Sequence, residues 1–144
     1  MSYHKLMLEN QTIFTKMVFE SLADEKLTSG QPKVLEYLFE NNGAVQKDIA
    51  EACLIEQATL TSLLSRMEKS RLIERKSKNG DKRFICVYLT DKGRKSGEMV
   101  INNLSLIEKS ALAGFSENEI IQFINFLERV NANLIDKREE NNIE

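Results

Sequence analysis

The sequence predicts a mainly α-helical protein that contains one two-stranded β-hairpin. Only one proline and six glycines interrupt its 144 residues, which favours long helices. Apolar residues recur at helical spacing over most of the chain. Residues 72–89 are the exception, because two short apolar stretches there flank Lys78-Asn79-Gly80-Asp81, a sequence typical of a tight turn between antiparallel strands.

The composition is that of a soluble, globular chain, and we expect one domain over residues 1–144. Hydrophobic residues make up 42% and charged residues 29%, which is ordinary for a folded domain of this length. No apolar run approaches the roughly 20 residues that span a bilayer, and the N-terminus lacks a secretion signal. With two cysteines and no disulfide framework, a cytoplasmic protein without a membrane partner is expected.

The first half of the chain predicts two helices followed by a helix-turn-helix. The first helix covers about residues 2–25, and Pro32 opens a second that ends near Gly43. A short helix over 46–52, a break at 53–55 and a helix over 56–70 come next. That last helix has an apolar stripe formed by Leu60, Leu63, Leu64 and Met67. Its opposite face is small, polar and cationic, as in a recognition helix.

A β-hairpin follows this helix-turn-helix directly. Residues 72–75 and 84–89 predict two short strands, and Asn79-Gly80 between them tolerates the left-handed backbone of a tight reversal. A hairpin in this place is a wing. The fold class is therefore a winged helix-turn-helix with a two-stranded β-wing.

The C-terminal part predicts two more long helices. Thr90 caps a helix over 91–112, and Ser116 with Glu119 forms a capping box for the last helix. The last helix has an apolar stripe formed by Ile120, Ile124, Leu127, Val130 and Leu134. One small domain cannot cover these faces, so the long helices at 1–28 and 91–140 are expected to form a symmetric homodimer around a DNA-binding part at 30–90.

Charge is concentrated in one segment. The chain has a net charge of −2, but residues 66–83 alone contain eight basic and three acidic side chains, a net charge of +5. A local basic segment in an acidic protein favours a polyanionic partner.

The order of elements and the run from Ile55 to Gly93 resemble the MarR family of bacterial winged-helix transcription regulators. The family's wing signature is Asp-x-Arg followed by Leu-Thr-x-x-Gly, and the matching residues are Asp81, Arg83, Leu89, Thr90 and Gly93. Ala58-Thr59-Leu60-Thr61, Arg66-Met67-Glu68-Lys69 and Leu72-Ile73-Glu74-Arg75 also resemble family patterns. Two positions depart from it: Arg71 stands where the family commonly has glycine, so the turn after the recognition helix is expected to differ, and Ser62 stands where many members have arginine.

The resemblance implies a sequence-specific regulator that binds double-stranded DNA at a pseudo-palindromic operator. Small polar side chains allow close approach to base edges, where Gln57 suits adenine and the methyl groups of Ala58 and threonine suit thymine. Arg66 and Lys69 are expected to meet phosphates, and Arg83, held by Asp81, to enter the minor groove. The expected DNA-binding residues are Gln57, Ala58, Thr59, Thr61, Ser62, Arg66, Lys69, Lys78, Asp81, Lys82 and Arg83.

The resemblance also implies a repressor that a small-molecule effector releases from DNA. The effector cleft would be lined by Phe14, Met17, Phe39 and Met99, although the same side chains suit core packing.

Two other functions are weighed against this one. A redox-responsive regulator would use Cys86 or Cys53, whereas inert packing is the simpler role for both thiols. A dimeric protein-interaction module would not bind DNA, which the basic segment argues against. We expect no enzyme, metal site or cofactor, because the single histidine, His4, has no catalytic or metal-binding arrangement around it.

Overall fold

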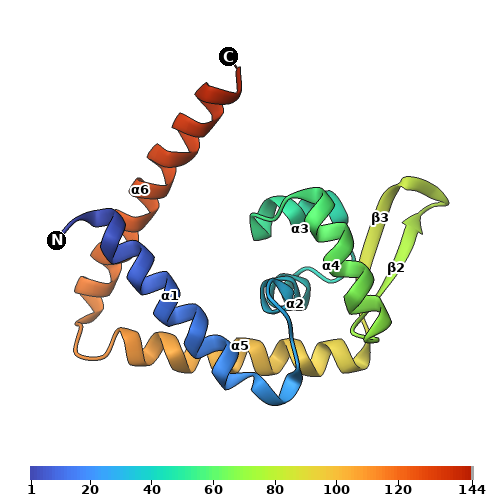
Figure 1. Ribbon diagram of the computed structural model, residues 1–144, viewed down its shortest axis with the longest axis horizontal. Helices are drawn as coiled ribbons and strands as arrows, with labels where there is room; N and C mark the ends of the chain where they lie inside the picture. The colour runs from blue at the N-terminus through green and yellow to red at the C-terminus, as the bar shows by residue number, and fades with distance from the viewer. Residues whose placement is uncertain (144) are drawn as a thin grey trace. The chain divides into compact units, whose positions relative to one another are not determined.

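The computed structural model describes residues 1–143 (Figure 1). The helices are α1 (Tyr3–Ser21), α2 (Gln31–Glu40), α3 (Gln46–Cys53), α4 (Gln57–Lys69), α5 (Asp91–Ala111) and α6 (Glu117–Ile143), with a 3-10 helix at Ala23–Glu25. The strands are β1 (Ala44–Val45), β2 (Ile73–Lys78) and β3 (Asp81–Leu89). These elements confirm the mainly α-helical winged helix-turn-helix that the sequence predicts.

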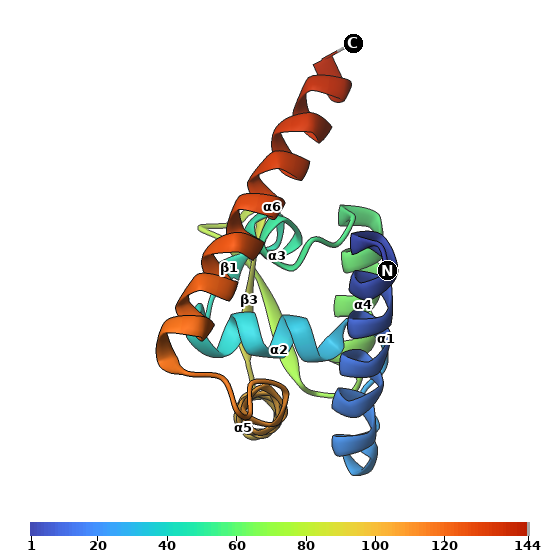
Figure 2. The same cartoon turned by 90° about the vertical axis from the view of Figure 1, so that its left-hand side faces the viewer.

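The chain divides into two compact units, Met1–Ile107 and the segment from Glu108 onward. In the first unit α2 passes between α3 and α5, and α4 lies beside it (Figures 1 and 2). The core forms around α2, where Val34, Leu35 and Leu38 are fully buried against apolar residues of α3, α4 and α5. This core fixes the helix-turn-helix, because α3 and α4 both bury their apolar faces in it.

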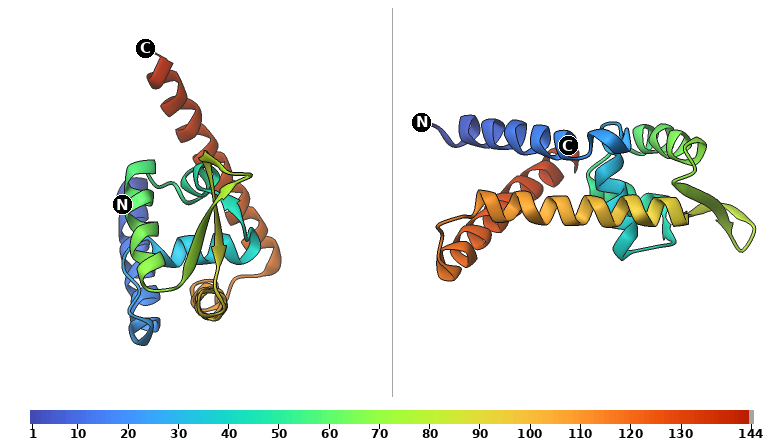
Figure 3. Two further views of the ribbon diagram at one scale, coloured as in Figure 1. Left: turned by 90° about the vertical axis from the view of Figure 1, so that its right-hand side faces the viewer. Right: turned by 90° about the horizontal axis from the view of Figure 1, so that it is seen from below.

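The sheet has three antiparallel strands in the order β1-β3-β2. Strands β2 and β3 form the predicted wing, which extends away from the helices (Figure 3). The structure adds β1, whose residues Ala44 and Val45 pair with Val87 and Cys86. This pairing joins the base of the wing to the start of α3, and it makes β3 the central strand.

The Leu-Thr-x-x-Gly segment leads from β3 into α5, and hydrogen bonds connect it to the turn that follows α4. The hydroxyl of Thr90 donates to the carbonyl oxygen of Arg71 at 2.6 Å and accepts the backbone N–H of Gly93 at 3.0 Å. The backbone N–H of Thr90 donates to the carbonyl oxygen of Leu72 at 3.1 Å. Thr90 therefore caps α5 as predicted and also holds the turn that follows α4.

The second unit contains α6, which begins at the predicted capping box. The backbone N–H of Ser116 donates to Glu119 at 2.7 Å, and the backbone N–H of Glu119 donates to the Ser116 hydroxyl at 3.2 Å. Among the described residues of α6 no side chain is buried. Apolar side chains stay exposed along it, among them Phe123, Ile124, Phe126 and Leu134.

Within residues 1–143, none of the helices is both long and apolar enough to cross a membrane.

Candidate nucleic-acid interface

Helix α4 presents the polar face that the sequence predicts. Its apolar stripe is at most 2% exposed. The opposite face is exposed and contains Gln57, Ala58, Thr59, Thr61, Ser62, Arg66 and Lys69. The small side chains stand at the N-terminal end and the two cations further along, so the backbone of the first turns is accessible to a ligand.

Thr61 is tied to both its own helix and α3. Its hydroxyl donates to the carbonyl oxygen of Gln57 at 2.9 Å and lies 2.6 Å from the Nε2 atom of Gln46. Because the threonine proton is already donated, the Gln46 amide nitrogen is the donor in the second bond. The sequence does not reveal this contact, because the two residues are 15 positions apart and neither has a distinctive motif.

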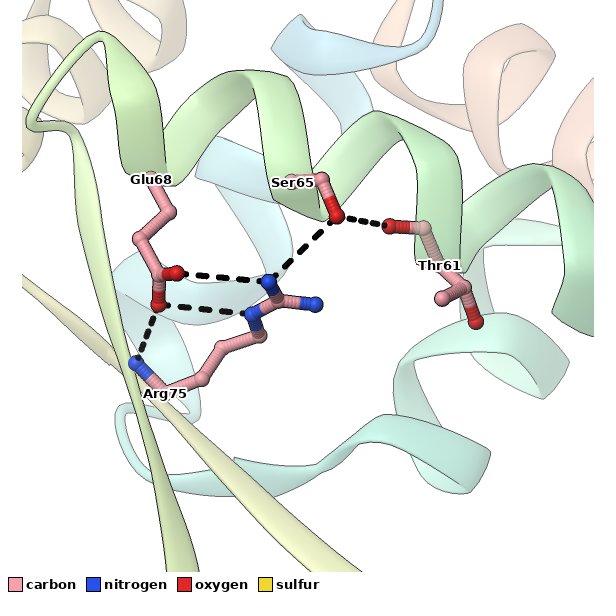
Figure 4. Close-up of polar contacts among 4 residues, drawn as sticks. All are labelled: Thr61, Ser65, Glu68 and Arg75. Atoms are coloured by element: carbon pink, nitrogen blue, oxygen red, sulfur yellow. Dashed lines mark hydrogen bonds and ion pairs between the residues drawn. The ribbon is translucent and has the colours of Figure 1, made fainter.

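Further along α4, Arg75 of β2 binds Glu68 and Ser65 (Figure 4). Its guanidinium donates to both carboxylate oxygens of Glu68, at 3.2 and 3.3 Å, and to the Ser65 hydroxyl at 3.3 Å. Its backbone N–H donates to Glu68 as well, at 3.2 Å. These hydrogen bonds from Arg75 lower the pKa of Glu68. One cation of the basic segment thus joins the wing to α4.

The wing holds Arg83 by a dense set of polar contacts. Its Nε and Nη2 atoms donate to the Asp81 carboxylate at 2.8 to 3.2 Å, and its backbone N–H donates there at 3.0 Å. The guanidinium also lies 5.9 Å from the centre of the Phe84 ring. Hydrogen bonds from Arg83 lower the pKa of Asp81. The hydrogen bonding expected between Asp81 and Arg83 is therefore present.

An irregularity in the hairpin displaces Arg83 from the regular ladder. Ser77 pairs with Ile85, but the next residue, Lys78, pairs with Asp81. Residues 82–84 of β3 therefore have no partners in the ladder with β2. Such bulges reorient side chains at sheet edges, and the Arg83 side chain is 83% exposed. Lys78 and Lys82 are exposed on the same tip, and neither forms an ion pair with any residue in the described part of the chain.

A cleft of about 420 Å³ separates the wing from the helix-turn-helix. Gln46 and Gln57 border it on the helical side, and Lys78, Arg83 and Phe84 border it on the wing side. Amide and cationic groups therefore face one another across a gap between α4 and the wing.

A second cavity, of about 490 Å³, lies on the other side of α4. Phe14 and Val18 of α1 line it together with Thr59, Leu63 and Arg66 of α4. The spacing of Thr59 and Arg66, seven residues or two turns, puts them on one side of the helix. Both residues thus border this cavity as well as the exposed face.

Phe14 is the one residue of the expected effector cleft that lines this cavity. Met17 and Met99 are each 41% exposed elsewhere on the surface, because each lies one position from a buried valine and its side chain points about 100° away. The half-buried Phe39 packs near Gly97 and lies 5.6 Å below the guanidinium of Arg94.

The turn after α4 keeps a left-handed backbone despite its arginine. Arg71 has a φ of 62°, in the region where glycine is free of strain and other residues are not. Its backbone N–H donates to the backbone carbonyl oxygen of Glu68 at 3.0 Å, and its own carbonyl oxygen accepts a hydrogen bond from the Thr90 hydroxyl. The turn thus takes a left-handed conformation that suits glycine, although an arginine stands there.

Both cysteines are buried. Cys53 is 7% and Cys86 8% exposed, and burial is the main cause that raises the pKa of Cys53. The Cys53 thiol lies 3.6 Å from the carbonyl oxygen of Lys33. Both positions fit packing.

The MarR family model matches residues 27–85, which run from just before α2 into β3. This span holds the whole helix-turn-helix and most of the wing. Over this part of its length the chain is similar to the winged-helix MarR family. The HTH-type transcriptional regulator TtmR of Methylorubrum extorquens (strain PA1) is 40% identical over 73 residues, 51% of this chain. The chain matches only 37% of the length of TtmR.

Two further likenesses extend over most of the chain. The HTH-type transcriptional repressor MdtR of Bacillus subtilis (strain 168) is 28% identical over 120 residues, 81% of this chain and 77% of MdtR. The crystal structure of the S. aureus MepR–DNA complex has a TM-score of 0.85 and 26% identity, covering 93% of this chain and 99% of MepR. The likeness to MepR includes the α1 and α6 regions that flank the family match.

Proposed function

We propose that this chain is a homodimeric transcriptional regulator of the MarR type that binds a pseudo-palindromic DNA site and represses transcription until a small molecule releases it. The observation that carries the proposal is the exposed, small-residue face of α4 beside a wing that presents Arg83. An α-helix of this kind fits the major groove, and a projecting arginine fits the narrower minor groove. MepR, with the same fold, has been crystallised with DNA.

The dimer is supported by uncovered apolar surface on the terminal helices. On α1, Leu6, Leu8 and Ile13 are each about half exposed, and on α6 Phe126 and Leu134 are 58% and 56% exposed. Exposed apolar side chains along a helix are typical of an interface. A second copy of the chain supplies a matching surface by two-fold symmetry, and a two-fold dimer reads a two-fold DNA site.

Repression and its relief are supported by the name of MdtR and by the cavity beside α4. Apolar side chains, among them Phe14, Val18 and Leu63, line that cavity together with the charged residues Lys33, Glu36 and Arg66. It suits a small, mostly apolar molecule with a polar group. Because Thr59 and Arg66 border both the cavity and the exposed face of α4, an occupant would act directly on the recognition helix.

Recovery of genomic DNA tests the function. Purified protein is mixed with sheared genomic DNA, and the bound fragments are sequenced. The affinity of the protein for these fragments is then measured at increasing salt concentrations. We expect fragments that share an inverted repeat, with affinity that falls steeply as salt rises. Lys69→Gln should reduce the number of counterions released on DNA binding, read from the slope of log affinity against log salt, by about one per protomer. Lys109→Gln lies outside the proposed DNA interface and should leave this slope unchanged.

The same measurement decides between this function and the two alternatives. A protein-interaction module would enrich no DNA sequence and release no counterions. A redox-responsive regulator would lose DNA binding when its thiols are oxidised. Since both thiols are buried, we expect DNA binding by the native dimer to be unchanged by peroxide at concentrations that leave the fold intact.

A further inference from the structure

We infer that Thr61 reads the 5-methyl group of thymine, and that Gln46, outside the recognition helix, fixes it in that role. The inference rests on the proposed DNA-binding function and names a specificity determinant within it. It follows from the hydrogen bonds that occupy the Thr61 hydroxyl.

The Thr61 hydroxyl has no proton left to donate to a base. Its single proton goes to the carbonyl oxygen of Gln57 at 2.9 Å. The major-groove edges of guanine and adenine, and the O4 atom of thymine, present acceptors that require a donor. Thr61 therefore cannot serve these groups without breaking a bond within its own helix.

The hydroxyl oxygen also uses one of its two lone pairs. Gln46 donates to it through Nε2 at 2.6 Å, from the N-terminus of α3. The side chain is thus held from two directions, and its orientation does not depend on DNA. A threonine in a helix otherwise divides between two rotamers, so the Gln46 amide selects one of them.

The methyl group takes part in neither of these hydrogen bonds, so it can contact a ligand without breaking one of them. Thr61 is exposed although its hydroxyl is engaged, and its neighbours on the outer face, Ala58 and Ser62, are small. A helix with such neighbours approaches base edges closely. The 5-methyl of thymine is the apolar group on the floor of the major groove, so it is the matching partner for an apolar contact.

The test compares the methyl group on the protein with the methyl group on the DNA. The wild-type dimer selects its best duplex from a random-sequence pool, and each thymine of that duplex is replaced in turn by deoxyuridine. Uracil keeps every hydrogen bond of thymine and lacks only the methyl. We expect one thymine in each half-site at which uracil weakens binding about fourfold, which is what the burial of one methyl group is worth.

Two substitutions then separate the methyl from the hydroxyl of Thr61. Thr61→Val loses the bond to Gln46, but valine has a single strongly preferred rotamer in a helix, so its methyl group needs no partner to orient it. This variant should therefore retain the affinity and the uracil penalty within about twofold. Thr61→Ser keeps the hydroxyl and its bonds but lacks the methyl. It should bind the thymine duplex about fourfold more weakly and show no further loss on uracil, because the partner methyl is already gone.

Gln46→Met tests the positioning role, because it keeps the length of the side chain and removes the donor. The uracil penalty should shrink while the thermal midpoint of unfolding stays unchanged, which a merely structural contact would not produce. An unchanged penalty would overturn the part assigned to Gln46.

The outcomes also separate this inference from the function on which it rests. If the wild-type dimer selects no sequence, the proposed function fails and the inference fails with it. If it selects a duplex in which no uracil weakens binding, only the inference fails. The inference also fails alone if Thr61→Ser binds normally while Thr61→Val does not, since the hydroxyl and not the methyl would then contact the base.

Discussion

Gly93 of α5 lies directly against the carbonyl oxygen of Leu72, so close that a Cβ atom at position 93 would collide with that oxygen. Leu72 follows the end of α4, and its carbonyl also accepts the backbone N–H of Thr90. The glycine of the Leu-Thr-x-x-Gly signature therefore serves a close approach between α5 and the turn after the recognition helix.

Gly93→Ala should destabilise the fold by at least about 2 kcal/mol, because the added methyl group meets backbone that Thr90 holds in place. Urea denaturation measures the loss. Gly97→Ala is the matched control in the same helix, since a Cβ there lies 3.2 Å from the Phe39 ring and 3.4 Å from the Leu35 carbonyl oxygen, which is tight packing but not a collision. Equal losses for both variants would show that the collision is relieved at little cost.

Arg71→Gly should stabilise the chain by up to about 1 kcal/mol. An arginine at a φ of 62° stores backbone strain, and glycine removes it at the cost of a more flexible unfolded chain. Arg71→Ala removes the same side chain but keeps the strain, so it should show no gain. The free energy of unfolding of the three proteins decides, and a gain by the alanine variant would point to charge as the cause.

The helical elements and the wing were predictable because their signals are local. The stripe from Leu60 to Met67 repeats at helical spacing, and Asn79-Gly80 specifies a tight turn by itself. Strand β1 was not predicted, because a strand of two residues is too short to show an alternating pattern in the sequence. It forms because the free edge of β3 pairs with Ala44 and Val45.

The parts of the site that depend on distant contacts were predicted less well. Gln46 and Thr61 meet through the packing of α3 on α4, and no spacing in the sequence implies it. The cavity beside α4 is lined by Phe14 but not by Met17 or Met99, because which residues of an amphipathic helix border a cavity depends on how the helix is rotated against its neighbours. The DNA-binding roles of the exposed residues stay predictions.

Acid should weaken the junction between the wing and α4. Arg75 lowers the pKa of Glu68 in the folded chain, so this pair contributes stability above the ordinary glutamate pKa of about 4.3 and loses it as the pH falls through the lower folded value. Glu68→Gln should cost less than about 1 kcal/mol at neutral pH, because the pair is partly exposed. Thermal midpoints across the acid range should converge for the two proteins. A constant difference at every pH would mean that packing, and not charge, links the two side chains.

A charge on the apolar stripe of α6 should disrupt the proposed dimer. Leu127 is half-buried on this helix, and Leu127→Asp would place an unpaired carboxylate in the interface, which is costly. Sedimentation at micromolar concentration should show a dimer for the wild type and a monomer or an unfolded chain for the variant. Asn125→Asp adds the same charge at an exposed position and should remain dimeric. A stable wild-type monomer would overturn the dimer.

Arg83→Ala should weaken DNA binding by about 1–3 kcal/mol, with the larger loss on operators that have A·T-rich flanks, where the minor groove is narrow and most negative. Arg83→Lys should recover only part of this affinity, because lysine keeps the charge but loses the planar group that Asp81 holds by two nitrogens.

Asp81→Ala should weaken binding in the same direction but less, since it leaves the cation in place without its orientation. The double variant should resemble Arg83→Ala, because Asp81 acts only through Arg83. Titrations of all four variants and the wild type on A·T-flanked and G·C-flanked duplexes measure these effects. The negative charge of Asp81 also repels DNA phosphates. Tighter binding by Asp81→Ala would therefore mean that this repulsion outweighs the benefit of orienting Arg83. Unchanged binding by Arg83→Ala on both duplexes would mean that the wing does not enter the groove.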